Sequence, residues 1–113
     1  MNVPLSSSEH IPSLFPGGIK RVTVSSFNLP PADGVLISEE NAETAKANLS
    51  KGTVIVALDG IQVHNFDQFT YARDSVTTQG LDLIVWQDNQ YHEVKAKPPG
   101  RRFGVHMPDY KRN

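Results

Sequence analysis

The side chains in this chain that could do chemistry are four histidines and a scatter of serines and acidic residues. No two histidines stand four residues apart, the spacing that places two metal-binding imidazoles on one face of a helix; they are His10, His64, His92 and His106. No Gly-x-Ser-x-Gly motif holds a serine on a sharp turn as a nucleophile. We therefore predict no catalytic residue, no metal site and no cofactor. Hydrolase activity is kept as a remote alternative.

The charged and glycine-rich segments do not favour a phosphate or nucleic-acid site. Residues 17–18 are a Gly-Gly pair, too short for a phosphate-binding loop. Arg101, Arg102, Lys111 and Arg112 form a modest basic tail, but the whole chain has eleven basic and twelve acidic side chains and a formal net charge of −1. No overall field would draw it to nucleic acid. We expect a solvated tail and no nucleic-acid partner.

Length and composition indicate one domain of ordinary balance. The chain has 113 residues, of which 38% are hydrophobic and 20% are charged, enough for a single modest core. It has no cysteine, which excludes internal disulfides, thiol catalysis and cysteine-ligated zinc. Residues 1–18 lack the features of a signal peptide, and no segment has the apolar length of a transmembrane helix. We predict no direct membrane insertion, and the compartment is left open.

Several strands are predicted from apolar alternation and turn residues. Residues 19–27 alternate in part and indicate a half-exposed strand, and residues 34–38 form a short apolar run typical of a buried strand. Residues 54–58 are apolar without interruption, as in a strand buried on both faces. Asp59-Gly60 is the strongest turn signal, and a returning strand follows at residues 61–64.

Two helices and a hairpin complete the prediction. Asn41 is expected to cap a short helix, Asp67 to cap a longer one that runs to about residue 77, and residues 81–97 to form the hairpin. Together these elements predict an α+β fold, a small curved antiparallel sheet or partial barrel of five or six strands with two helices. The expected core residues are Val54, Ile55, Val56, Leu58, Ile61, Val63, Phe69, Ala72, Val76, Leu83 and Val85.

The order of motifs within residues 33–96 resembles a known family. It runs from Gly34-Val35-Leu36-Ile37 through a small-residue helix to "KGTVIVALDG" at residues 51–60, and then to Phe66-Asp67 and the strand "LDLIVWQ". This order is similar to that of PDZ domains, particularly the bacterial type attached to high-temperature-requirement serine proteases. The resemblance implies a module that takes an extended peptide between an edge strand and the second helix. It implies residues 15–99 as the domain, residues 1–14 as a flexible lead-in and residues 100–113 as a tail that can add a strand.

The loop that would hold a ligand's terminal carboxylate is the main departure from that family, which has an apolar-Gly-apolar motif directly before the edge strand. Pro16-Gly17-Gly18-Ile19 is the nearest candidate in position, and its glycines can free N–H groups for an anion, but the apolar residue between them is missing. Phe103-Gly104-Val105 fits the motif better and lies at the other end of the domain. There it is either a circularly permuted loop or only a final strand.

On this resemblance, the expected partner is a protein or peptide C-terminus, bound by a monomer or by part of a longer chain. The second helix should present one row of side chains, about one turn apart, to an edge strand at residues 19–24. The predicted peptide-binding residues are Gly17, Gly18, Ile19, Arg21, Val22, Gln68, Ala72 and Ser75. The alternative is a structural or regulatory domain with the same fold that binds no free C-terminus.

Overall fold

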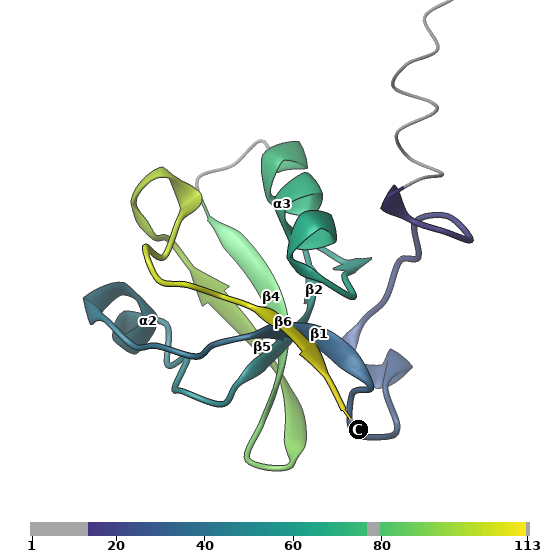
Figure 1. The fold of residues 1–113 in the computed structure, drawn as a ribbon, viewed down its shortest axis with the longest axis horizontal. Helices are drawn as coiled ribbons and strands as arrows, with labels where there is room; N and C mark the ends of the chain where they lie inside the picture. Colours follow the sequence, from purple (N-terminus) through teal and green to yellow (C-terminus); the bar gives the residue numbers. More distant parts are fainter. Residues whose placement is uncertain (1–13, 77–79, 113) are drawn as a thin grey trace, which may run out of the picture.

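Strand β2, Val54–Leu58, is the centre of the fold because both of its faces are apolar and all five of its residues are buried. The computed structural model describes residues 14–76 and 80–112. It contains a six-stranded antiparallel sheet in the order β5-β4-β2-β1-β6, with β3 paired to β2, and the sheet does not close (Figure 1). The other strands are β1 Asp33–Leu36, β3 Ile61–Gln62, β4 Leu81–Gln87, β5 Gln90–Ala96 and β6 Asp109–Lys111.

Two tight turns set the register of the sheet. Asp59 and Gly60 have φ values of 53° and 79°, and they join Leu58 directly to its partner Ile61. The segment 88–89 has φ values of 55° and 64° and joins β4 to β5 in the same way. Positive φ at both central residues defines the two-residue hairpin turn whose twist matches the strands. The predicted Asp59-Gly60 turn and the predicted hairpin are confirmed.

The first helix, α2, spans Ala42–Lys46 and begins as predicted. The Asn41 side chain accepts a hydrogen bond from the Thr44 N–H at 2.9 Å, and the Thr44 hydroxyl accepts one from the Asn41 N–H at 2.8 Å. This reciprocal pair satisfies two backbone donors that the first turn would otherwise leave unpaired.

The second helix, α3, spans Phe66–Ser75, and its cap differs from the prediction. The Asn65 side chain accepts a hydrogen bond from the Gln68 N–H at 2.9 Å, so Asn65 is the N-cap and the assignment of Asp67 was wrong. Asp67 lies inside the first turn, where its carboxylate faces the positive end of the helix dipole. The predicted extension to residue 77 falls outside the described residues; α3 ends at Ser75.

Replacing Asn65 by alanine should lower the free energy of unfolding by about 0.5–2 kcal/mol, because the Gln68 N–H loses its acceptor. Replacing Asp67 by alanine removes only a favourable charge near the helix start. Its expected cost is about 0.3–1 kcal/mol, and less in high salt. Thermal denaturation of the two variants compares the costs directly. A larger loss for Asp67→Ala, or a loss unchanged by salt, would contradict the cap seen here.

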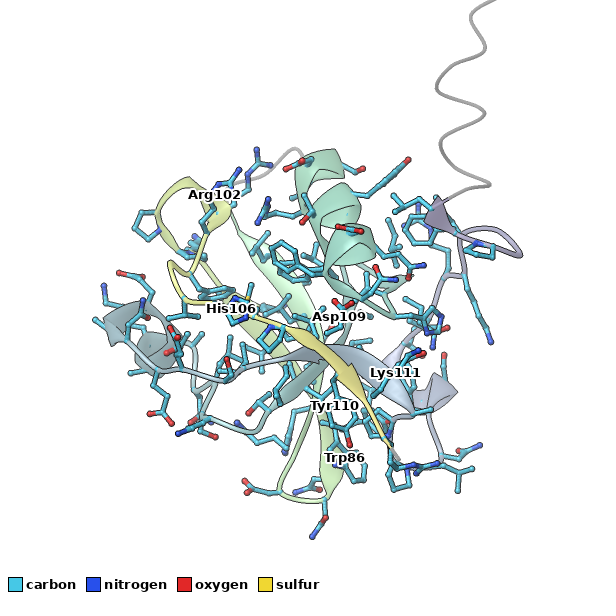
Figure 2. The ribbon with its side chains drawn as sticks, in the orientation of Figure 1. Trp86, Arg102, His106, Asp109, Tyr110 and Lys111 are labelled. Atoms are coloured by element: carbon cyan, nitrogen blue, oxygen red, sulfur yellow. The ribbon has the colours of Figure 1, made fainter. Side chains whose placement is uncertain are left out.

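The core lies on both faces of the sheet, and all eleven predicted core residues are buried. One cluster fills the space between α3 and the sheet, with Ile55 and Phe69 among its members. A second cluster around Val56 lies on the other face, where Trp86 and Tyr110 pack against it (Figure 2). The side chains of β2 therefore supply both clusters, and a bulge between Ile55 and Ala57 interrupts their alternation.

The strand predicted at residues 19–27 is wrong. Arg21 forms only an isolated bridge to Ile61, and Val24–Ser26 forms a 3-10 turn. The physical reason is the lack of a long partner, because β3 is only two residues long and can pair with no more of this segment than residues 20–22. The place at the sheet edge beside β1 belongs instead to β6.

Candidate functional site

Strand β6 presents an open backbone edge. Backbone hydrogen bonds hold it beside β1: the Arg112 N–H donates to the Ala32 carbonyl, and the Leu36 N–H donates to the Pro108 carbonyl, each at 2.9 Å. Alternate residues of an antiparallel strand turn their backbone groups to opposite sides, so those of Met107, Asp109 and Lys111 face away from β1. Within residues 14–76 and 80–112 no hydrogen bond takes these outward groups. Another extended chain can therefore pair with this edge.

The segment that leads into β6 lies alongside α3. At the end of the helix, the Arg101 guanidinium donates to the Val76 carbonyl. At its beginning, the Phe66 N–H donates to Asp109 Oδ1 at 2.8 Å. The chain thus runs from one end of α3 to the other, with Phe103-Gly104-Val105 before β6 (Figure 2). This segment and β6 are therefore joined to both ends of α3.

One flank of α3 is turned toward this segment. Residues three and four apart share a face of a helix, so Phe66, Thr70 and Arg73 form one row. Phe66 stacks on Phe69 with ring centroids 5.9 Å apart, and the Arg73 guanidinium lies 6.0 Å from the centre of the Phe69 ring. The hydroxyl of Thr70 is buried and has no hydrogen-bond partner in the part of the chain that the structure describes.

The opposite flank of α3 carries Gln68, and the chain's own N-terminal segment covers it. Gln68 is only 4% exposed, and its amide donates to the Leu14 carbonyl and accepts from the His64 N–H, both at 2.7 Å. Phe15 is also buried and meets Tyr71 edge-on, with ring centroids 5.4 Å apart. Both polar groups of Gln68 are therefore used within the protein.

The other predicted peptide-binding residues on the helix are dispersed. Ala72 is fully buried in the core, while Ser75 is exposed and donates its hydroxyl to the Tyr71 carbonyl at 2.9 Å. Ala72 is thus enclosed in the core, whereas Gln68 lines a pocket but has both of its amide groups engaged within the protein. Whether any of them contacts a ligand stays a prediction.

The predicted residues of the N-terminal segment lie beside β3 and not beside β1. Gly17 and Gly18 have φ values of 87° and 93°, in a turn that the Gly18 N–H closes on the Phe15 carbonyl at 2.7 Å. Val22 is buried in the cluster on the sheet face away from α3. Ile19 packs against the cluster under α3, and Arg21 pairs with β3. The structure does not bring these residues together as one edge strand opposite α3.

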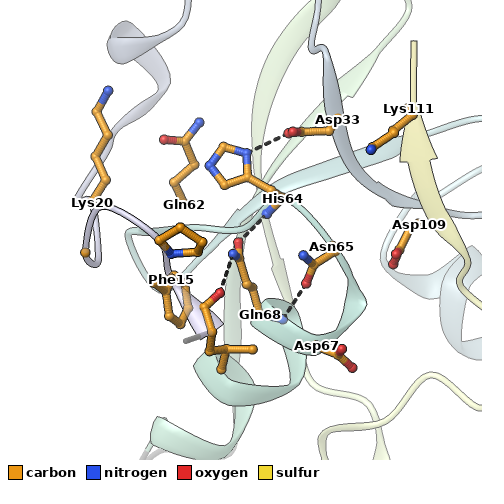
Figure 3. Close-up of a pocket in the computed structure, with 13 residues that line it drawn as sticks. Phe15, Lys20, Asp33, Gln62, His64, Asn65, Asp67, Gln68, Asp109 and Lys111 are labelled. Carbon is orange, nitrogen blue, oxygen red and sulfur yellow. Dashed lines mark hydrogen bonds and ion pairs between the residues drawn. The ribbon is translucent and has the colours of Figure 1, made fainter. Parts of the chain in front are cut away.

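A polar pocket of about 620 Å³ lies at the beginning of α3 (Figure 3). His64 Nδ1 and Asp33 Oδ1 are 2.7 Å apart on its wall. The remaining charged side chains around it come from the N-terminal segment, from α3 and from β6; they are Lys20, Asp67, Asp109 and Lys111. Among the residues that the structure describes, no group of three or more histidine, aspartate and glutamate side chains could hold a metal ion.

Comparisons with protein-family models, with curated proteins and with solved structures find no match to this chain. In the described part of the chain, no helix has the length and apolar character needed to cross a membrane. The case for a site therefore rests on geometry. The flank of Phe66, Thr70 and Arg73 was not among the predicted site residues, and the Phe103-Gly104-Val105 motif is the sequence signal nearest to β6.

Proposed function

We propose that this chain is a PDZ-like peptide-binding module in which an extended peptide adds as a strand to β6, between that strand and α3. The observation that carries the proposal is the open backbone edge of β6 lying alongside a helix flank. Strand addition uses main-chain hydrogen bonds for affinity and side-chain pockets for selectivity. Sequence reasoning placed the edge at residues 19–24; the present proposal places it at β6.

The loop before β6 supports binding of a terminal carboxylate. The N–H groups of Phe103, Gly104 and Val105 have no hydrogen-bond partner among the described residues, and Gly104 has a φ of 77°. Consecutive free N–H groups around a left-handed residue form a concave anion site. The loop is anchored, because the Phe103 side chain is 2% exposed and its carbonyl accepts from the Asn41 amide at 2.7 Å. A peptide antiparallel to β6 would end with its carboxylate here.

The expected affinity is micromolar, equivalent to about −8 kcal/mol. A short flexible peptide loses conformational freedom when it is ordered as a strand, and this loss offsets much of the gain from main-chain hydrogen bonds.

The structural or regulatory alternative has one observation in its favour. The bond from the Phe66 N–H to Asp109 joins the helix to the edge strand at 2.8 Å. It closes the groove at the beginning of α3, so a ligand strand must either pass over this contact or displace it. A groove that never opens would leave β6 as a purely structural edge.

Titration with ¹⁵N-labelled protein tests the proposal. Peptides with apolar C-termini should shift the amide signals of residues 103–111 and of the Phe66–Arg73 flank. Methylating the peptide nitrogens that face β6 should abolish binding, whereas methylating the alternate, outward nitrogens should not, because only the first set can donate to a strand. No shifts at millimolar peptide would favour the structural alternative.

Two arginine substitutions distinguish the two flanks of α3. Thr70→Arg places a long charged side chain on the flank that faces β6, and it should weaken peptide binding at least about tenfold, since an unpaired charge must be desolvated. Ser75→Arg makes the same change in charge on the other flank and should alter binding less than about twofold. If Ser75→Arg weakened binding more than Thr70→Arg, the peptide would bind instead on the flank of α3 that carries Gln68.

A further inference from the structure

We infer that strand β5 is a self-association edge, along which two copies of this chain pair as antiparallel strands about a two-fold axis at Val94. β5 is the terminal strand at the end of the sheet opposite β6, so this surface is separate from the proposed peptide site. It is also the longer of the two terminal strands, because β5 has seven residues and β6 has three.

The outer edge of β5 has open backbone groups. The Asp82 carbonyl accepts the Asp59 N–H at 2.7 Å, so the backbone groups of Asp82 face β2. Lys95 lies opposite Asp82 in β5, and the two residues therefore form a pair without mutual hydrogen bonds. The backbone groups of Lys95, and by alternation those of Glu93 and Tyr91, face away from β4. No other backbone segment of the described chain bonds them, so they are open to a further strand.

The charges of β5 favour one register for two identical antiparallel strands. Hydrogen bonds form where one outward-facing residue lies opposite another, so the two-fold axis must pass through a residue and not between two. An axis at Glu93 or at Lys95 would place that residue opposite its own copy, and like charges directly opposite each other are destabilising. An axis at His92 would place Glu93 opposite Tyr91, with no complementary charge. An axis at Val94 places each Glu93 opposite Lys95 of the second copy.

The charges along this edge also balance when two copies are paired. Each copy brings two acidic and two basic side chains, which are Asp82, Glu93, Lys95 and Lys97. Lys95 Nζ lies 3.1 Å from Asp82 Oδ1, and no basic side chain of the described chain is within ion-pair distance of Glu93. Because an ammonium group has three donors, Lys95 can keep Asp82 and also bind Glu93 of the second copy. Charges on an edge strand oppose pairing in most registers, and here they favour one.

Sedimentation equilibrium of the full chain at low ionic strength, from about 10 μM to 1 mM, measures the association. Glu93→Lys and Lys95→Glu each create two like-charge pairs beside the axis, and each should weaken self-association at least about tenfold. The double variant Glu93→Lys/Lys95→Glu restores two opposite-charge pairs and should associate within about twofold of the unmodified protein. An equimolar mixture of the two single variants should form a heterodimer for the same reason. Lys51→Glu, the same charge change on an exposed residue outside β5, should leave the association within about twofold.

A single introduced cysteine tests the position of the axis, since the chain has no cysteine of its own. Val94→Cys places two thiols in a directly opposed pair whose Cα atoms lie about 4.5 Å apart, a separation that a disulfide can bridge. His92→Cys, on the same face of β5, would place its Cα about 13 Å along the strand from that of the second copy. Mild oxidation should therefore cross-link Val94→Cys into a dimer and leave His92→Cys monomeric.

The outcomes separate self-association from its register. Glu93 and Lys95 are exposed, so the charge variants should keep the fold, and circular dichroism checks this. A protein that stays monomeric at about 1 mM, or an association that neither single charge reversal weakens, would overturn the inference. Failure of the double variant to associate, or cross-linking of His92→Cys in preference to Val94→Cys, would overturn the axis at Val94.

Discussion

Truncating Phe69 to alanine should lower the free energy of unfolding by about 3–5 kcal/mol. The side chain is 1% exposed and lies between α3 and the sheet. Its ring also contacts two residues of the neighbouring flank of α3: Phe66 stacks on it, and the Arg73 guanidinium lies 6.0 Å from its centre. The loss combines the transfer of a large apolar group with a cavity that the surrounding backbone cannot fill. Urea denaturation followed by circular dichroism measures it.

Two variants calibrate this expectation. Phe66→Ala removes a ring of the same size from a half-buried position and should cost clearly less, because part of that ring is already in water. Phe69→Leu keeps most of the volume and should cost about 1–2 kcal/mol, which keeps the comparison measurable if the alanine variant does not fold. A loss below about 1 kcal/mol for Phe69→Ala would mean that the helix does not pack on the sheet through this residue.

The local parts of the fold could be predicted from the sequence because each carries its own signal. The uninterrupted apolar residues of β2 leave no polar face, so that strand has to be central. Asp59-Gly60 adopts positive φ readily and fixes the return to Ile61 without help from distant residues. The core list follows from these two features and from the helical spacing of α3.

The edge strand could not be predicted from the sequence, because a segment forms a strand only where another strand is long enough to pair with it. Residues 19–27 alternate more clearly than "DYK" at β6, yet β3 is too short to pair with more than the segment 20–22. The cap of α3 was missed for a related reason, since Asn65 and Asp67 are equally good cap residues and only the three-dimensional path decides between them.

The predicted site residues were chosen from the predicted edge strand. Once residues 19–24 are taken as the edge strand, the row of Gln68, Ala72 and Ser75 is the natural helix face for a ligand. In the structure Leu14 and Phe15 cover the Gln68 end of that row, while the Phe66 N–H at the start of the other flank donates to Asp109. Helical spacing gives the rows of α3, but only the position of neighbouring segments shows which row is free.

Gly34 should tolerate no side chain, and Gly34→Ala should lower the free energy of unfolding by about 3–5 kcal/mol. An added Cβ would lie 2.6 Å from the Ile55 carbonyl oxygen and 2.8 Å from Val54 Cγ1, closer than real contacts of this kind. The first of these is backbone, so β1 would have to move away from β2. The φ of +152° adds strain for any residue with a side chain.

Gly52→Ala separates the steric clash of an added Cβ from the strain of a positive φ. Gly52 also has a positive φ, of +97°, but an added Cβ would meet nothing within 4 Å, so about 1–2 kcal/mol is expected there. The excess cost of Gly34→Ala is then the cost of moving β1, and β6 is attached to the sheet only through β1 in the described chain. Hydrogen exchange should therefore show Leu36 and Arg112, whose N–H groups join the two strands, losing protection in Gly34→Ala and keeping it in Gly52→Ala. Equal stability of the two variants would mean that β1 and β2 are not in close contact at Gly34, and that the edge offered by β6 is not fixed in place by this glycine.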